Sequence, residues 1–379
     1  MVETLQGAYE FEQNAFETEK TYLPLFDSLL GSMRPDAVAI EQIYLSHPSE
    51  EFNLRVRESL KDGIPSYTAT LKSKGAVEAK GLRRLEIETD ISPETYALYK
   101  SSHYPAIKKI RAEPHENVMV DWFEDGYVHL ESEHPVAWIN FLQRWGISET
   151  DFIEITGDKQ ADSEWRAHLL HRKRNLGHEA FMVDEVLSSE QIAFDILQTL
   201  RSASQATVTI AGRSGSGKST IIRDLQYKLH NEGIDSNVLS TDDYHRGKSW
   251  LDAYKGSDWT DWDDAIVYDI AELKRDLDDL RVNRSVVGRQ IDFDSQEPQF
   301  SNVLEPAPVT IVEGLFAGAP SLAEYADHSY ELPTPLATCV GRRIMRDIQE
   351  RPQFADPKIN LKYILENAEP AYQAQSRSR

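Results

Sequence analysis

TVTIAGRSGSGKSTIIRDLQYKL, residues 207–229, decides the fold of the second half of this 379-residue chain. An apolar strand breaks into glycines and then into a helical pattern. The segment GRSGSGKS fills every fixed position of the Walker A phosphate-binding pattern, with Gly212, Gly217, Lys218 and Ser219. VTIVEGLF, residues 309–316, is a second buried-strand candidate. Strands that alternate with helical patterns predict an α/β domain with a mainly parallel sheet.

The residues of this loop suit a chain of nucleotide phosphates. Glycines let the backbone fold around phosphates, and amides at the start of the helix donate to them. Lys218 can neutralise the β and γ oxygens, and Ser219 can hold Mg²⁺. A Gly/Ser turn before a helix is the alternative, and the loop alone does not separate kinases from other nucleotide-binding classes. The expected nucleotide contacts are Gly212, Ser214, Gly215, Ser216, Gly217, Lys218, Ser219 and Thr220.

Two further segments indicate phosphoryl transfer. In VLSTDDYHRG, Asp242 and Asp243 follow a short apolar strand, where a carboxylate can accept a proton from an attacking hydroxyl. In GRRIMRDIQER, Arg343, Arg346 and Arg351 can neutralise charge on the transferring group. The alternative for the aspartates is an Asp-rich turn that caps a helix. The alternative for the arginines is a solvated helix face with i,i+4 ion pairs.

With these motifs, residues 206–372 resemble the uridine kinase and phosphoribulokinase family of P-loop kinases. The resemblance implies an ATP-dependent kinase that uses Mg²⁺ and phosphorylates a hydroxyl of a nucleoside or another small metabolite. Ile291 and Gln296 stand where the family has a Tyr and a His that read the base, so the acceptor stays open. The implied roles are catalysis for Lys218, Asp242, Arg343, Arg346 and Arg351, substrate binding for Asp242, Tyr244, Asp263 and Arg343, and metal binding for Ser219 and Glu313.

The N-terminal half has a different pattern. Apolar positions between Tyr9 and Leu30 indicate a helix, and five alternating runs after Ala37 predict an antiparallel sheet or barrel. These runs are VAIEQIYL, FNLRVRES, SYTATLKSKG, LRRLEIETDI and YVHLESEHP. The expected organisation is an N-terminal extension (1–35), a strand domain (36–160), a helical connector (161–204) and the P-loop domain (205–379).

Like charges recur at i and i+2 in these runs, which aims each pair at one face of a strand. Basic pairs could grip a polyphosphate and acidic pairs could hold a divalent metal, although an ordinary sheet with one charged, solvated face is the alternative. The pairs are Arg55 with Arg57, Lys72 with Lys74, Glu86 with Glu88, and Glu131 with Glu133.

The order of these pairs, together with EITGDKQ at residues 154–160, resembles the CYTH family of triphosphate-tunnel barrels. The resemblance implies a polyphosphate ligand at Arg55, Arg57, Lys72 and Lys74, and metal at Glu41, Glu86, Glu88, Glu131 and Glu133. The family's first-strand Glu-x-Glu-x-Lys signature reads Ala39, Glu41 and Ile43 here. One metal-binding carboxylate and the lysine are therefore absent, and we expect polyphosphate binding to be retained where hydrolysis is not. A metal-dependent organic or inorganic triphosphatase, or a regulator that senses nucleotides or polyphosphate, are the alternative functions.

Composition limits the possible partners and the cellular location of the protein. A formal net charge of -22 opposes broad binding to nucleic acid or to anionic membranes. The single cysteine, Cys339, excludes an intramolecular disulfide framework. The acidic N-terminus does not match a secretory signal, and no run of 18 apolar residues could span a bilayer. We therefore expect a cytoplasmic protein whose partners are ATP and a small-molecule acceptor, with a homo-oligomer left open.

Overall fold

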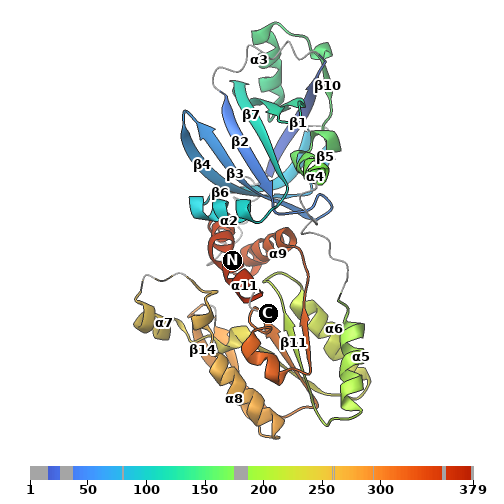
Figure 1. The fold of residues 1–379 in the computed structure, drawn as a ribbon, viewed down its shortest axis with the longest axis vertical. Coiled ribbons are helices and arrows are strands. Elements are labelled where there is room, and N and C mark those ends of the chain that lie inside the picture. Colours follow the sequence, from blue (N-terminus) through green and yellow to red (C-terminus); the bar gives the residue numbers. More distant parts are fainter. Residues whose placement is uncertain are drawn as a thin grey trace. The chain divides into compact units, whose positions relative to one another are not determined.

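The computed structural model describes residues 16–25, 37–78, 81–174, 187–257, 259, 261–292, 294–351 and 356–376, drawn as a ribbon in Figure 1. Its internal contacts divide the chain into two compact units. Unit 1 contains Met1–Met182 and Leu336–Lys362, and unit 2 contains Val183–Pro335 and Tyr363–Arg379. The chain thus leaves unit 1, returns to it and leaves it again. Residues 336–362, which the sequence places in the P-loop domain, pack within unit 1.

Unit 1 is built on an antiparallel ten-stranded sheet, as the alternating runs predict. The strand order is β10-β1-β9-β8-β7-β2-β3-β4-β6-β5, and β1 also pairs with β6. The strands are β1 (Phe16–Pro24), β2 (Val38–Tyr44), β3 (Phe52–Lys61), β4 (Ile64–Ser73), β5 (Ala76–Glu78), β6 (Gly81–Asp90), β7 (Ala106–His115), β8 (Val118–Phe123), β9 (Val128–Ser132) and β10 (Phe152–Glu154).

The helix expected near the N-terminus is wrong where the structure describes it, because residues 16–24 form strand β1. This strand pairs with β6 over its first half and with β9 and β10 over its second half. Tyr22 is buried and stacks on Trp138, with ring centroids 3.8 Å apart. Pairing with three strands and burial of Tyr22 override the local pattern. The rest of the expected helix lies outside the described residues.

Four regular helices of unit 1 are α2 (Pro93–Ser101), α3 (Pro135–Trp145), α4 (Ser163–Lys173) and α9 (Leu336–Glu350). Helix α9 packs on β3 at Gly341, where a Cβ atom would come within 2.6 Å of ring carbons of Phe52, so a larger residue would not fit. Thr338 Oγ1 donates to Glu50 Oε2 at 3.5 Å beside this contact. The unit also contains α10 (Pro357–Tyr363), whose last residue belongs to unit 2, and the 3-10 turns η2 (Glu149–Asp151) and η3 (Lys159–Ala161).

Unit 2 has a four-stranded parallel sheet in the order β12-β15-β11-β16, which confirms the predicted α/β architecture. The strands are β11 (Ala206–Ala211), β12 (Ser236–Ser240), β15 (Val309–Gly314) and β16 (His328–Glu331), and the helices are α5 (Ser189–Leu200), α6 (Lys218–Asn231) and α8 (Ile270–Arg281). Val208 and Ile210 of β11 pack on one side of the sheet with helices α5 and α6, and Val312 of β15 packs on the other side with helix α8.

The remaining elements of unit 2 surround this sheet. They include α7 (Lys248–Lys255), α11 (Glu369–Ser376) and a hairpin of β13 (Val286–Asp292) with β14 (Glu297–Leu304). The short turns are η4 (Thr241–Tyr244), η5 (Ala265–Val267), η6 (Pro320–Tyr325) and the π-helical η8 (Ile364–Ala368). Every helix in the described part of the chain is too short or too polar to cross a membrane.

Two carboxyl groups of unit 1 are withdrawn from water: Glu164 of α4 is buried, and Glu50, which binds Thr338 of α9, is half-buried. Burial raises the pKa of Glu164 to about 8, although a hydrogen bond from Ser46 opposes the rise. Burial also raises the pKa of Glu50 to about 7, against the His47 amide, which donates to it at 2.7 Å. Glu50 adds to the rise at Glu164, so the two groups interact. Both therefore hold protons at a pH where they would be ionised in the unfolded chain.

We expect the thermal midpoint of the full-length protein to fall as the pH rises from 5 to 8. The folded pKa of Glu164 is raised, so unfolding releases its proton across this window, and stability is lost as pH increases. Glu164→Gln should remove much of this slope in scanning calorimetry. Glu94→Gln, which changes an exposed carboxyl on α2, is the control and should retain it. An unchanged slope in Glu164→Gln would contradict the burial argument.

Candidate functional site

The P-loop connects the fully buried strand β11 to helix α6. Gly215 and Gly217 adopt φ values of 82° and 95°, a left-handed region that residues with a side chain rarely adopt. The Ser216 amide donates to the Arg213 carbonyl at 3.1 Å and closes the turn. A Cβ at Gly212 would lie 2.8 Å from Ser216 Oγ, so a larger residue there would require this hydroxyl to move. The loop keeps the shape that phosphate binding needs.

Lys218 holds the two ends of this loop together. Its Nζ donates to the carbonyl oxygens of Gly212 at 2.9 Å and Arg213 at 3.1 Å. Ser219 and Thr220 are exposed on the first turn of α6, beside the glycines. The predicted nucleotide contacts therefore lie together on one loop and one helix start, where amides and the helix dipole attract anions.

Two carboxylates lie at the carboxyl ends of β12 and β15, on one side of β11 in the sheet. Glu313 lies on β15 and accepts a hydrogen bond from Ser240 Oγ at 2.8 Å. Burial raises the pKa of Glu313, Lys218 lowers it and Asp242 raises it again. These couplings place Lys218, Asp242 and Glu313 within electrostatic reach of one another. Asp242 is exposed in η4, where Ser240 Oγ accepts from its amide at 3.3 Å.

The two residues after Asp242 point into the protein. Asp243 is half-buried and accepts a hydrogen bond from the Ile291 amide at 3.4 Å. Burial raises the pKa of Asp243 to about 6, with Asp242 and Glu313 adding to the rise. Tyr244, expected to bind substrate, lies in the hydrophobic core and donates its hydroxyl to Asp276 at 2.8 Å. The structure therefore does not bring Tyr244 to the other predicted residues.

Asp263 lies in a second group of polar and aromatic residues. It accepts a hydrogen bond from the Tyr363 hydroxyl at 2.7 Å. The neighbouring Trp262 stacks on His245, with centroids 5.3 Å apart. Burial lowers the pKa of His245 to about 4, against the charges of Glu297 and Asp263, so this imidazole is neutral at pH 7. His245 was not selected from the sequence, although it stands in the VLSTDDYHRG segment.

The three candidate lid arginines converge on one buried carboxylate, Asp347 of α9. The distances to its oxygens are 3.8 Å from Arg343 Nε, 3.0 Å from Arg346 Nη2 and 3.6 Å from Arg351 Nη1. Asn360 Nδ2 also donates to it at 3.0 Å. These arginines belong to unit 1, whereas the P-loop belongs to unit 2.

The oxygen groups near the P-loop fit a magnesium ion. Glu313 and Asp243 have raised pKa values, partly because Asp242 repels their negative charge, and a divalent cation would relieve this repulsion. Carboxylate and hydroxyl oxygens are the ligands that Mg²⁺ prefers. Ser219 and Glu313 are therefore reasonable ligands beside nucleotide phosphates.

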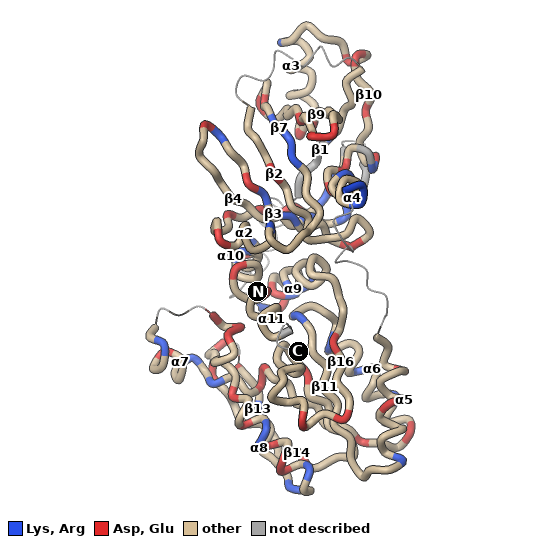
Figure 2. The backbone as a smooth tube through the Cα atoms, in the orientation of Figure 1, with Lys and Arg blue, Asp and Glu red and all other residues tan. Residues whose placement is uncertain are grey.

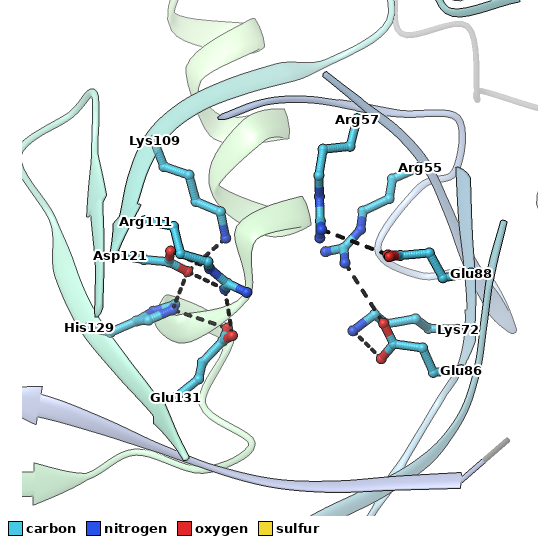
Figure 3. A network of polar contacts seen from close by, with 10 residues as sticks. All are labelled: Arg55, Arg57, Lys72, Glu86, Glu88, Lys109, Arg111, Asp121, His129 and Glu131. Carbon is cyan, nitrogen blue, oxygen red and sulfur yellow. Dashed lines mark hydrogen bonds and ion pairs between the residues drawn. The ribbon is translucent and has the colours of Figure 1, made fainter. Parts of the chain in front are cut away.

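The second candidate site is a group of buried and half-buried charges on one face of the unit 1 sheet (Figure 3). Lys and Arg positions along β3 and β7 are visible on the backbone in Figure 2. Six predicted residues belong to this group, and Lys109, Arg111, Asp121 and His129 join them although the sequence analysis missed them. The six are Arg55, Arg57, Lys72, Glu86, Glu88 and Glu131.

Arg111 is the best-paired cation of this group. Its guanidinium donates twice to Asp121, at 2.7 and 2.6 Å, and once to Glu131 at 2.6 Å. Lys109 also donates to Asp121, at 2.7 Å. Burial lowers the pKa of Lys109 to about 7, and the nearby charge of Arg111 adds to the fall although Asp121 opposes it. Asp121 itself has a strongly lowered pKa because, despite its burial, Arg111 and Lys109 surround it.

Arg55 and Arg57 are more weakly paired. Arg55 lies 3.9 Å from Glu86, and Arg57 lies 3.7 Å from Glu88. Burial, Arg55 and Arg111 lower the pKa of Arg57 to about 10. Within the described residues, the Nε atoms of both arginines and the side chain of buried Gln42, which pairs with Arg57 across β2 and β3, have no hydrogen-bond partner. Buried unpaired donors favour an anionic ligand.

Asp121, His129 and Glu131 could offer ligand atoms to a metal, since these atoms lie within 4.8 Å of one another. However, Arg111 already binds both carboxylates. His129 also binds them, at 3.4 and 3.2 Å, which raises its pKa although burial acts the other way. As arranged, the group favours an anion over a second cation.

Three predicted residues lie away from this group. Glu41 is on the opposite face of β2 from Gln42, bound by Tyr96 at 3.1 Å and Lys100 at 2.6 Å. Lys74 follows β4 and donates to the Ser49 carbonyl at 2.8 Å. Glu133 follows β9 and is exposed. Residue spacing alone did not show where each strand ends or which face each side chain occupies, and this is why these three residues lie elsewhere.

The family comparison finds its match in the second half of the chain. Residues 207–368 match the model of the Phosphoribulokinase / Uridine kinase family. A uridine kinase of Staphylococcus haemolyticus is 30% identical over 160 residues, covering 42% of this chain and 76% of the relative. One from Proteus mirabilis is 33% identical over 165 residues, covering 41% and 76%. A putative fructose transport system kinase from Silicibacter sp. TM1040 aligns with a TM-score of 0.44 and 22% identity, covering 50% and 95%.

Protonation of Lys109 should strengthen anion binding in unit 1. Because its pKa is about 7, its charge disappears as the pH rises from 6 to 8.5. The two proteins to compare are Lys218→Ala, whose P-loop is disabled, and the double variant Lys218→Ala with Lys109→Met. At pH 6, calorimetry should show that the single variant binds tripolyphosphate about ten times more tightly than the double variant. At pH 8.5 this ratio should approach one. A ratio that stays constant would contradict the role of the Lys109 proton.

Proposed function

Through residues 207–368 the chain belongs to the phosphoribulokinase/uridine kinase family, and we propose that this part is a kinase that transfers the γ-phosphate of ATP to a hydroxyl of a nucleoside or another small metabolite. One observation carries the proposal: Lys218, Asp242 and Glu313 gather at the carboxyl ends of three adjacent parallel strands, beside the P-loop. This edge of a parallel sheet is where open α/β folds bind ligands.

The roles follow from these positions. The loop amides and Lys218 hold the β- and γ-phosphates, and Asp242 accepts the proton of the attacking hydroxyl. The hydroxyl oxygen bonds to the γ-phosphorus while the bond to the bridging oxygen breaks and ADP leaves. A magnesium ion at Ser219 and Glu313 would supply positive charge to the phosphates. Arg343, Arg346 and Arg351 are candidate catalytic residues on the family resemblance alone.

The acceptor side favours a neutral molecule with hydroxyl groups. Asp242, Asp243, Asp263 and Glu313 give this region a negative charge that repels a phosphorylated acceptor. Asp263 can accept hydrogen bonds from sugar hydroxyls, and Trp262 offers an aromatic face next to it. A screen of nucleosides and sugars with ATP, read as ADP formation and by mass of the product, tests the proposal.

A second function is supported by the buried charges of unit 1. We propose that this unit is a CYTH-like barrel that binds a triphosphate or polyphosphate between its basic rows. The pairing of β1 with both β6 and β9 supports a closed sheet, and the unpaired donors of Arg55 and Arg57 support an anionic ligand. Because Arg111 binds the carboxylates that a metal would need, a binding or sensing role is favoured over triphosphate hydrolysis.

Lys218→Ala should abolish phosphoryl transfer, because the β and γ charges lose their fixed countercharge. Tripolyphosphate binding to unit 1 should survive, since none of its basic residues changes. Turnover is measured as ADP release with the best acceptor, and the melting curve verifies folding. Wild-type turnover in this variant would overturn the assignment of the P-loop.

Asp242→Asn should lower kcat about 10²- to 10⁴-fold while ATP binding persists, because loss of a general base acts on the chemical step. Asp243→Asn is the matched control, since an asparagine oxygen can still accept from the Ile291 amide. Its effect should be far smaller. If Asp243→Asn proves the more damaging change, the base belongs at that position instead.

A further inference from the structure

Arg213, the second residue of the P-loop, is bound to the C-terminal helix. Its Nε donates to Glu369 Oε2 at 2.7 Å, and its Nη2 donates to Glu369 Oε1 at 2.9 Å. Glu369 is the first residue of α11 and only 2% exposed. A two-bond contact of this kind fixes both the position and the plane of the guanidinium. All the residues involved belong to unit 2.

Neighbouring side chains hold this pair in place. Gln373, one turn further along α11, donates to Glu369 Oε1 at 2.9 Å. The guanidinium carbon of Arg213 lies 4.4 Å from the ring centre of Tyr372. The Tyr372 hydroxyl in turn bonds to Glu331, the last residue of β16, which pairs with β11. The pair is therefore tied to the sheet as well as to the helix.

We infer that Glu369 is a positioning residue for nucleotide binding, because it anchors Arg213 and thereby fixes the P-loop backbone. The carbonyl oxygen of Arg213 is one of two that hold Lys218 Nζ, at 3.1 Å. Anchoring residue 213 by its side chain thus sets the place from which Lys218 reaches the phosphates. Because the guanidinium of Arg213 donates to Glu369, its role in this inference is to hold the loop and not to bind phosphate. The inference rests on the proposed use of the P-loop for ATP.

Glu369→Gln should weaken binding of a non-hydrolysable ATP analogue about ten-fold in calorimetry on the full-length protein, because a neutral amide holds the guanidinium less firmly. In turnover, KM for ATP should rise while KM for the acceptor stays within about two-fold. If Glu369 instead competes with phosphate for Arg213, the same variant would bind the analogue more tightly. Tighter or unchanged binding overturns the inference.

Two further variants separate positioning from stability. Glu324→Gln removes an exposed ion pair with Lys274 in the same unit and should leave analogue binding unchanged. The double change Arg213→Met with Glu369→Met replaces the ion pair by apolar side chains, which is often neutral for stability. We expect its melting temperature to recover towards wild type while analogue binding stays weak. Recovery of both would reduce Glu369 to a structural role.

These measurements also distinguish this inference from the kinase proposal. Binding of the analogue needs no acceptor, so a chain that binds ATP but phosphorylates nothing would contradict the kinase proposal alone. A chain that phosphorylates an acceptor with unchanged ATP affinity in Glu369→Gln would contradict only the role of Glu369.

Discussion

Buried charge must be met by opposite charge, by hydrogen bonds or by a ligand, and the candidate sites of this protein depend on this constraint. Asp347 is met by three arginines, and Arg213 is met by Glu369. Glu164 avoids carrying a buried charge, because its raised pKa keeps the carboxyl protonated and neutral. Arg55 and Arg57 are met only in part. Incomplete pairing of this kind is what supports the proposed anionic ligand of unit 1.

The candidate site at the P-loop and the candidate site in unit 1 have excess charge of opposite sign. Near the P-loop, Asp242, Asp243 and Glu313 leave an excess of negative charge, which suits a cation and a neutral acceptor. In unit 1 the surplus is positive and buried, as the lowered pKa values of Lys109 and Arg57 indicate. The chain as a whole carries a formal net charge of -22. The anion binding proposed for unit 1 would thus depend on local burial of cations rather than on the overall charge.

The features predicted from sequence were those encoded by neighbouring residues. The P-loop motif specified a strand, a turn and a helix, and charges at i and i+2 placed Arg55 and Arg57 on one face. Arg213 with Glu369 could not be predicted because the pair joins distant segments of the chain. Lys109 with Asp121 could not be predicted because the pair depends on the register of β7 with β8. Glu41 illustrates the converse, since one step along β2 places its side chain on the opposite face from Gln42. Strand β1 was missed because its pairing, not its periodicity, makes it a strand.

The return of α9 to unit 1 bears on how the coding sequence could be divided. A gene fragment that ends at residue 182 would contain the whole ten-stranded sheet but would lack Gly341, leaving the ring of Phe52 without the backbone packed against it. A fragment that begins at residue 183 would carry α9 without the strands on which it packs. Neither unit is therefore a contiguous segment of the chain, and recombination between residues 182 and 183 would separate α9 from the strands on which it packs.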